Sequence, residues 1–162
     1  MATHYVALDL ETTGLDRDND AIIEIGAVRF DGSGAVVDTF EALVNPHVPL
    51  PPQVQDLTGI GESELADAPP IYLVAPQFQA FIGDDPLVGH NIINFDVPFL
   101  SRAGIVTPPH AYDTQDISTL LVQGLPEYSL AALAAHFEIE FPVRHRALAD
   151  AAQLLLEWSG AC

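Results

Sequence analysis

The chain contains no lysine and only five arginines, against 23 aspartates and glutamates, so its formal net charge is −18. Non-specific binding of nucleic acid depends mainly on contacts from lysine and arginine to phosphates. This composition therefore excludes a protein that holds long nucleic acid through a general basic surface. Four of the arginines nevertheless lie close in sequence to acidic motifs, at Arg17, Arg102, Arg144 and Arg146. We expect the little positive charge present to surround a single site.

Cysteine and long apolar runs are also scarce. The one cysteine, Cys162, excludes an intrachain disulfide and cysteine-based zinc sites, which favours a reducing, cytoplasmic setting. No apolar stretch has the length of a membrane span, and no basic segment followed by an apolar stretch resembles a signal peptide. With 162 residues, 49% of them apolar, the chain is expected to form one domain over residues 1–162.

Secondary-structure signals predict a mixed α/β fold. Strands are expected at 4–10, 21–30 and 35–44, with Asp-Gly-Ser-Gly as the hairpin turn between the last two. They would form a three-stranded meander. Shorter strands are expected at 87–90 and 111–113.

Helices are expected between and after the short strands. A proline-rich connection should lead to a short helix near 54–57 and then a turn near 62–66. Apolar spacing predicts further helices over 71–82, 97–103, 114–123, 130–137 and 146–158. Pro76 is compatible with its helix only if that helix begins close to it. Asp113 and Ser129 are expected to be N-caps. Meander and helices together indicate a mixed sheet covered by helices.

Four acids and one histidine lie beside strongly apolar sequence, where a charge is costly unless it is compensated. They are Asp9, Glu11, Asp96, His145 and Asp150. Asp9 and Glu11 share one face of a strand, and they repel unless a cation lies between them or one is protonated. Oxygen ligands favour Mg²⁺ or Mn²⁺ over zinc. We predict two such ions held by the carboxylates, with His145 placed to take a proton from an attacking water.

Three motifs resemble those of DnaQ-like, or DEDDh, exonuclease domains over residues 4–158. The first is Asp-Leu-Glu-Thr-Thr-Gly at 9–14, and the second runs from Val-Gly-His-Asn through Phe-Asp to Phe-Leu at 88–100. The third is His-Arg-Ala-Leu-Ala-Asp-Ala at 145–151. A histidine five residues before the last aspartate, rather than a tyrosine four before it, is typical of the histidine branch. The chain is similar to epsilon-type proofreading exonucleases of bacterial DNA polymerase III and to helicase-associated exonuclease domains.

This resemblance implies a ribonuclease-H-like fold, with a five-stranded mixed sheet flanked by helices. It implies 3′→5′ hydrolysis of single-stranded or frayed DNA ends to nucleoside 5′-monophosphates, with His145 as general base and the four carboxylates as ligands of Mg²⁺ or Mn²⁺. The DNA preference is carried over from polymerase- and helicase-associated members. Substrate contacts are implied for Thr12, Thr13, Gly14, Leu15, Ile60, His90, Asn91 and Phe95.

The missing basic surface leads us to expect that a polymerase, helicase or other partner presents the 3′ end. Two other functions remain open, namely an exoribonuclease acting on short RNA and a non-catalytic module that binds nucleic acid or protein. Four mutually repelling acids have no chemical use in a module that only binds, which counts against the second. An endonuclease or integrase of the same broad fold would not account for His145 or for the His90–Asn91 segment.

Two further features have structural interpretations. Phe99 lies four residues after Phe95 on an expected helix, and this spacing favours a core position. Asp16, Asp18 and Asp20 form an acidic turn that we interpret as solvated surface, although their alternating spacing also leaves a weak cation site open.

Overall fold

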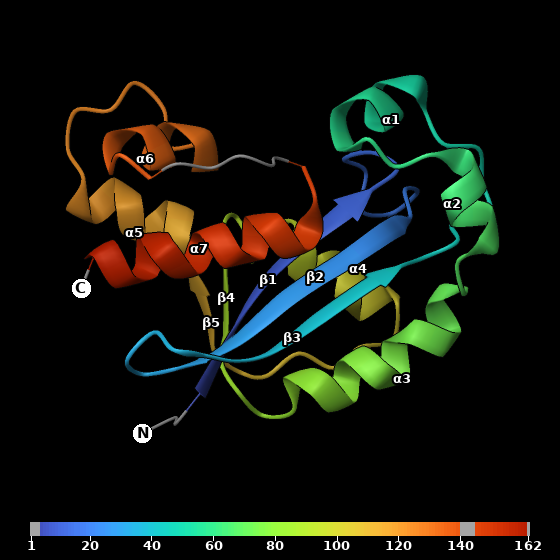
Figure 1. Cartoon of the computed structure of the whole chain (residues 1–162), viewed down its shortest axis with the longest axis horizontal. Helices are drawn as coiled ribbons and strands as arrows, with labels where there is room; N and C mark the ends of the chain where they lie inside the picture. The colour runs from blue at the N-terminus through green and yellow to red at the C-terminus, as the bar shows by residue number, and fades with distance from the viewer. Residues whose placement is uncertain (1–3, 140–144, 162) are drawn as a thin grey trace.

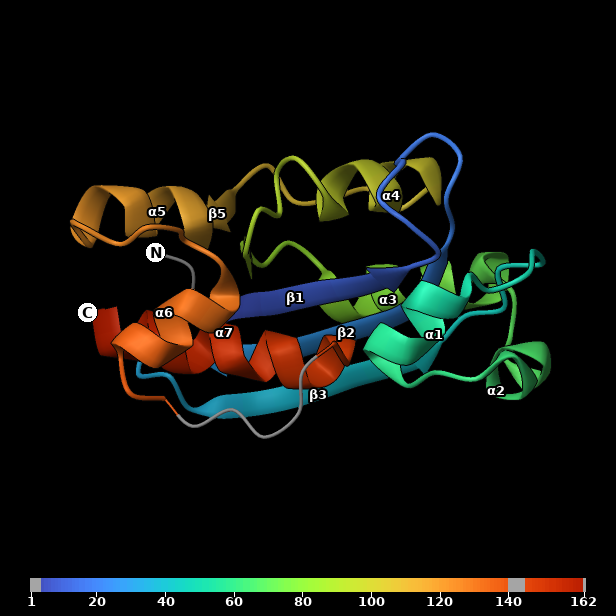
Figure 2. The same ribbon diagram turned by 90° about the horizontal axis from the view of Figure 1, so that it is seen from above.

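The computed structural model describes residues 4–139 and 145–161 and shows a twisted mixed sheet with helices on both faces (Figure 1, Figure 2). The five strands lie in the order β3-β2-β1-β4-β5. β1 pairs antiparallel with β2, β2 antiparallel with β3, and β4 parallel with both β1 and β5. Their bounds are His4–Thr12, Ile22–Asp31, Val36–Leu43, Leu87–Gly89 and Ala111–Asp113 for β1 to β5. The predicted meander and five-stranded mixed sheet are confirmed.

The described helices follow the expected pattern closely. Their bounds are Pro52–Thr58 (α1), Glu62–Asp67 (α2), Ile71–Ile82 (α3), Asp96–Arg102 (α4), Thr114–Leu121 (α5), Leu130–His136 (α6) and Ala147–Ala161 (α7). The Asp113 carboxylate accepts a hydrogen bond from the backbone N–H of Gln115 at 3.0 Å. The Ser129 hydroxyl accepts one from the N–H of Ala132 at 3.2 Å. Both predicted N-caps are therefore confirmed.

Two local expectations were wrong. The turn expected at 62–66 is helix α2, because the Glu64 carboxylate accepts the N–H of Gly61 at 2.9 Å and Leu65 is buried. Helix α3 begins five residues before Pro76 rather than close to it. The proline removes the donor for the carbonyl of Tyr72, but this side of the helix faces water, which can replace the missing bond.

The sheet buries an apolar cluster on each face. On one face Leu8 and Leu10 of β1 pack towards α3 and α4, in a cluster that also holds Phe99. On the other face Ala7 packs with Ala151 of α7. Figure 1 shows α7 and α3 on opposite sides of the strands. The alternation of β1 therefore directs the first acidic motif towards α7, and the core position predicted for Phe99 is confirmed.

Helix α7 lies close against the sheet at Gly26, the residue of β2 that pairs with Asp9 of β1. A Cβ atom at Gly26 would lie 2.0 Å from the carbonyl carbon of Ala147 and 2.0 Å from the nitrogen of Leu148. No side chain fits at such distances, so only glycine lets the first turn of α7 rest on β2. This contact places the beginning of α7 beside the acids of β1.

None of the helices in the described part of the chain has both the length and the apolar character that crossing a membrane requires.

Replacing Gly26 with alanine should therefore destabilise the protein strongly. The new methyl group overlaps backbone atoms, which cannot rotate away as a side chain can, so the cost should reach or exceed the usual overpacking range of about 1–3 kcal/mol. In a chain of this length each kcal/mol lowers the melting temperature by about 2–4 °C. Gly32→Ala is the control, because nothing lies within 4 Å of that position. Equal melting temperatures for the two variants in a thermal unfolding experiment would contradict this packing.

Candidate active site

A cleft opens where the C-terminal half of β1 meets the first turn of α7 and helix α6. It is lined by Asp9, Leu10, Glu11, His90, Leu130, Ala131, His145 and Asp150. Six of these residues come from the three sequence motifs, which are far apart along the chain. The topology therefore brings together four of the five residues singled out as metal ligands or general base, namely Asp9, Glu11, His145 and Asp150.

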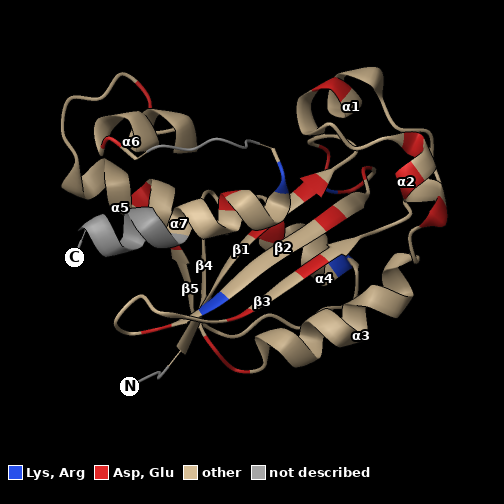
Figure 3. Cartoon of the chain, in the orientation of Figure 1, with Lys and Arg blue, Asp and Glu red and all other residues tan. Residues whose placement is uncertain are grey.

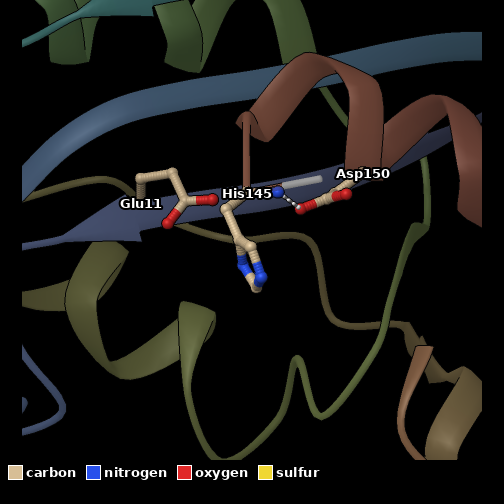
Figure 4. Close-up of side chains that lie close together, drawn as sticks. All are labelled: Glu11, His145 and Asp150. Atoms are coloured by element: carbon tan, nitrogen blue, oxygen red, sulfur yellow. Dashed lines mark hydrogen bonds between the residues drawn. The ribbon is translucent and has the colours of Figure 1, made fainter. Parts of the chain in front are cut away.

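Glu11, His145 and Asp150 lie closest to one another (Figure 4). Each offers one nitrogen or oxygen atom that lies within 4.8 Å of those of the other two, a spacing that a single metal ion can bridge. The backbone N–H of His145 donates to Oδ2 of Asp150 at 3.0 Å. This bond joins His145, two positions before α7, to the first turn of the helix, so the histidine and the aspartate are held as one unit.

Asp96, at the start of α4, is buried beside this cluster and only 2% exposed. Its Oδ1 atom has no hydrogen-bond partner within the part of the chain that the structure describes. Burial raises the pKa of Asp96 to about 8, with smaller contributions from the charges of Asp113 and Glu11, while the backbone N–H groups of Asp96 and Leu10 act in the opposite direction. A buried, unsatisfied carboxylate oxygen is the kind of atom that a cation would satisfy.

The two acids of β1, Asp9 and Glu11, also have raised pKa values. Burial raises the pKa of Glu11 to about 8, and the charges of Asp150 and Glu24 add to the effect. Burial also raises the pKa of Asp9 well above its usual value, and Asp96 is the largest of the neighbouring charges that contribute. Acids in this arrangement hold protons unless positive charge is added. Oxygen donors in such number fit a hard divalent cation such as Mg²⁺ or Mn²⁺.

Glu24 of β2 is a fifth acid near the site that sequence reasoning missed. It is fully buried and pairs with Glu11 across the sheet. Its carboxylate accepts hydrogen bonds from Nε and Nη2 of Arg146, at 3.0 and 2.7 Å, and from the backbone N–H of Ala147 at 2.8 Å. The signal for it was available, because a glutamate inside the apolar strand Ile22–Ile25 must find a buried partner.

The arginines are used differently from what the sequence led us to expect. Arg146 is committed to Glu24, and this ion pair raises its pKa further. Arg102 donates to the backbone carbonyls of Arg17 and Asp20, so it holds the acidic turn after β1. These two arginines therefore serve contacts within the protein and do not line the cleft. Arg144 lies outside the described residues.

The threonines of the first motif build the turn that follows β1. The Thr12 hydroxyl donates to the carbonyl of Gly14 at 2.6 Å, and the Thr13 hydroxyl donates to the Asp20 carboxylate at 2.9 Å. Asp16 likewise accepts the backbone N–H of Asp18 at 3.0 Å. The side chain of Leu15 projects from this turn and is 86% exposed. The acidic turn is thus a hydrogen-bonded loop that presents a leucine.

The second motif lies around the end of β4. Nδ1 of His90 lies 3.0 Å from the hydroxyl oxygen of Thr114, and burial lowers the pKa of His90, which favours the neutral imidazole. Asn91 has a φ of 58°, and its N–H donates to the Asp113 carboxylate at 2.9 Å. Asp113 therefore holds the loop after β4 in addition to capping α5. Of the second-motif residues expected to contact substrate, only His90 lines the cleft.

Two other expected substrate contacts lie away from the cleft. The ring of Phe95 lies 5.1 Å from that of Phe99 and packs against the core. Ile60 is 1% exposed and packs with Ile23, Leu50 and Leu65. The structure therefore does not bring the Ile60 side chain to the site. Conversely, Leu130 and Ala131 of α6 form a cleft wall that no motif indicated, because their pattern in the sequence is that of any amphipathic helix.

Comparison with known proteins identifies the family of the chain. The exonuclease family model matches residues 6–157. A DNA polymerase III PolC-type protein of Caldanaerobacter subterraneus is 44% identical over 151 residues, which are 91% of this chain and 11% of that protein. The DNA polymerase III subunit epsilon of Aquifex aeolicus is 34% identical over 152 residues, which are 91% of this chain and 74% of the subunit.

Solved structures show the same fold. Exonuclease I superposes with a TM-score of 0.86 at 19% identity, over 98% of this chain and 40% of that one. E. coli exonuclease I in complex with a dA16 oligonucleotide superposes with a TM-score of 0.83 at 18% identity, over 95% and 39% of the two chains. The expected ribonuclease-H-like architecture is thereby confirmed.

The chain spans only 10–11% of the length of the PolC-type relatives named DNA polymerase III. The family model nevertheless covers nearly the whole chain, and most of the epsilon subunit is matched. The chain therefore belongs to the DnaQ-like 3′→5′ exonuclease family, as its three motifs predicted.

Proposed function

We propose that this chain hydrolyses single-stranded or frayed 3′ ends of DNA, one nucleotide at a time, to nucleoside 5′-monophosphates. The observation that carries the proposal is the convergence of Asp9, Glu11, His145 and Asp150 on one cleft, with Asp96 buried beside them. The similarity to two kinds of DNA polymerase III protein supports DNA as the substrate.

Two divalent cations, Mg²⁺ or Mn²⁺, would be held by Asp9, Glu11, Asp96 and Asp150. The carboxylates fit them, because the raised pKa values of Asp9, Glu11 and Asp96 and the unsatisfied Oδ1 of Asp96 reflect missing positive charge. Bound there, the ions would supply electrostatic stabilisation to the attacking and leaving oxygens of the phosphodiester.

His145 is our candidate for the general base. Its imidazole lies at the cleft among the acids, and its backbone is tied to Asp150, so the ring is positioned at the place of reaction. A neutral imidazole there takes a proton from the attacking water, which makes the oxygen a better nucleophile towards phosphorus. The apolar wall formed by Leu130 and Ala131 would hold the terminal nucleoside.

The charge distribution indicates how substrate reaches the cleft. Acidic positions are spread over α1, α2 and the strands, whereas basic positions are few and scattered (Figure 3). Long DNA is therefore repelled by most of the surface, and binding depends on the site itself. We propose that a partner such as a polymerase or a helicase delivers the 3′ end. The shortage of positive charge is equally compatible with a short RNA substrate. The first experiment should therefore compare DNA and RNA oligomers.

The test is hydrolysis of a 5′-labelled single-stranded DNA oligomer with Mg²⁺, Mn²⁺ or EDTA. A ladder that shortens from the 3′ end is expected only with metal. Asp9→Ala should abolish it, because a ligand is lost. His145→Ala should slow it by about 10²–10⁴-fold, the usual worth of a general base.

His136→Ala is the matched control for the histidine, because His136 is exposed on α6 and does not line the cleft. It should leave the rate unchanged. A matched RNA oligomer degraded faster than the DNA would shift the proposal to an exoribonuclease. If both oligomers stay intact under every metal condition, the proposal of an enzyme active on its own is wrong and a binding module is favoured.

A second prediction concerns salt. Because few basic side chains are available to displace counterions, log Kd for a single-stranded oligomer should change only slightly with log salt, by a slope corresponding to about one or two phosphates. Fluorescence anisotropy with a catalytically inactive Asp9→Ala variant measures this slope without degradation. A slope equivalent to six or more phosphate contacts would refute the idea that the local site does the binding.

A third prediction concerns the stability of the metal-free protein. Because burial raises the pKa of Glu11 and Asp96 to about 8, the folded chain keeps protons that the unfolded chain releases near pH 4 to 5. Metal-free stability should therefore fall as the pH rises from about 5 to about 8. Mn²⁺ should restore it at pH 8 and have little effect at pH 5.

Asp96→Asn tests the same point, because it removes one of the repelling charges. The variant should melt several degrees higher than the wild type in EDTA at pH 8, at about 2–4 °C for each kcal/mol, and Mn²⁺ should stabilise it less. Asp67→Asn, which removes an exposed acid on α2, controls for net charge. An equal gain from both variants would show that general repulsion, rather than the site, sets the pH dependence.

A further inference from the structure

His145 has a backbone conformation that only its surroundings can maintain. Its φ is 58°, in the left-handed region that residues with a side chain rarely adopt. Such a conformation persists only where neighbouring contacts over-determine it. On one side the contact is the bond from the His145 N–H to Asp150. The contacts on the other side come from the next two residues, Arg146 and Ala147.

Those two residues are both bound by Glu24. One carboxylate oxygen accepts Nη2 of Arg146 at 2.7 Å and Nε at 3.0 Å. The other accepts the N–H of Ala147 at 2.8 Å and lies 3.2 Å from Nε of Arg146. Glu24 is fully buried and lies on β2, an inner strand that pairs with β1 on one side and β3 on the other. The chain just after His145 is thus fastened to β2 through a side chain and through the main chain.

We propose that Glu24 and Arg146 form a clamp that positions His145 for the exonuclease reaction. This inference rests on the function proposed above. Glu24 does not line the cleft, so it is a positioning residue that acts through the histidine. Arg146 supplies the fork of donors that a planar carboxylate binds with fixed geometry, which lysine cannot reproduce.

The electrostatics of the site exclude a simpler role for Glu24. Its negative charge adds to the repulsion felt by Asp9 and Glu11, so it does not relieve the charge of the cluster. A buried ion pair is also weak as a source of stability, because apolar residues of similar size often replace one at no cost. What this ion pair does provide is a fixed position for the two neighbours of Arg146, namely His145 and Ala147.

The experiment compares kcat and KM for single-stranded DNA in four proteins. Glu24→Gln keeps the shape of the side chain and removes its charge, and Arg146→Lys keeps the charge and removes the fork. Each should lower kcat by about 10- to 100-fold with little change in KM, as for other groups that orient a catalytic side chain. Glu41→Gln is the matched control, because Glu41 lies 3.8 Å from the same guanidinium but is half exposed. It should change kcat by no more than about twofold.

A double-mutant cycle separates positioning from folding. In a His145→Ala background, Glu24→Gln should have no further effect on kcat, because the group it positions is gone. If Glu24→Gln lowers kcat by the same factor with and without His145, it acts through the fold or the carboxylates and the clamp is refuted. Normal kcat in both Glu24→Gln and Arg146→Lys would refute it as well.

A readout that needs no activity keeps this inference distinct from the proposed function. Hydrogen exchange of the His145 and Ala147 amides, followed by NMR, should become faster in Glu24→Gln while amides of β1 and β3 stay protected. Glu41→Gln should leave all of them unchanged. If the wild type proves inactive on every oligomer, the proposed function fails, and unchanged exchange in Glu24→Gln overturns the clamp independently.

Discussion

The close approach of helix α7 to strand β2 is the constraint on which the candidate site depends. At Gly26 the helix backbone occupies the space where any side chain would be, and two residues away along β2 Glu24 binds the first turn of the same helix. The acids of β1 are paired with these two residues, Asp9 with Gly26 and Glu11 with Glu24. Seating the helix therefore also sets how far His145 and Asp150 lie from Asp9 and Glu11.

That geometry gathers acidic side chains in the interior of the protein. Many of the hydrogen bonds and ion pairs around the site satisfy these buried acids. Glu24 is satisfied by an arginine, and Asp150 and Asp113 are satisfied in part by backbone N–H groups. Asp9, Glu11 and Asp96 keep raised pKa values, so their compensation must come from protons or from cations. With no lysine in the chain, and with Arg102 and Arg146 engaged in contacts within the protein, divalent ions are the natural source of that positive charge.

The fold was largely readable from local pattern, because strand alternation, the Asp-Gly-Ser-Gly turn and the caps at Asp113 and Ser129 are decided within a few residues. Helix α2 was missed because its start depends on a side chain bonding back from Glu64 to Gly61, which resembles a turn in sequence. Ile60 was misplaced because a motif does not say whether an apolar residue faces a cleft or a core. The arginines were misjudged because closeness in sequence to an acidic motif does not indicate which acid they pair with.

The sequence by itself determined the family of this protein, since the acids and the histidine stand in the order and spacing of the three motifs. It also determined the strands and helices that carry them, because those depend on neighbouring residues. Only the tertiary structure decided how the site is held together. Glu24 meets Arg146, which lies 122 positions further along the chain, and α6 supplies a wall that no motif marks. Contacts of that kind depend on how helices and sheet pack in three dimensions, and local sequence carries no direct record of them.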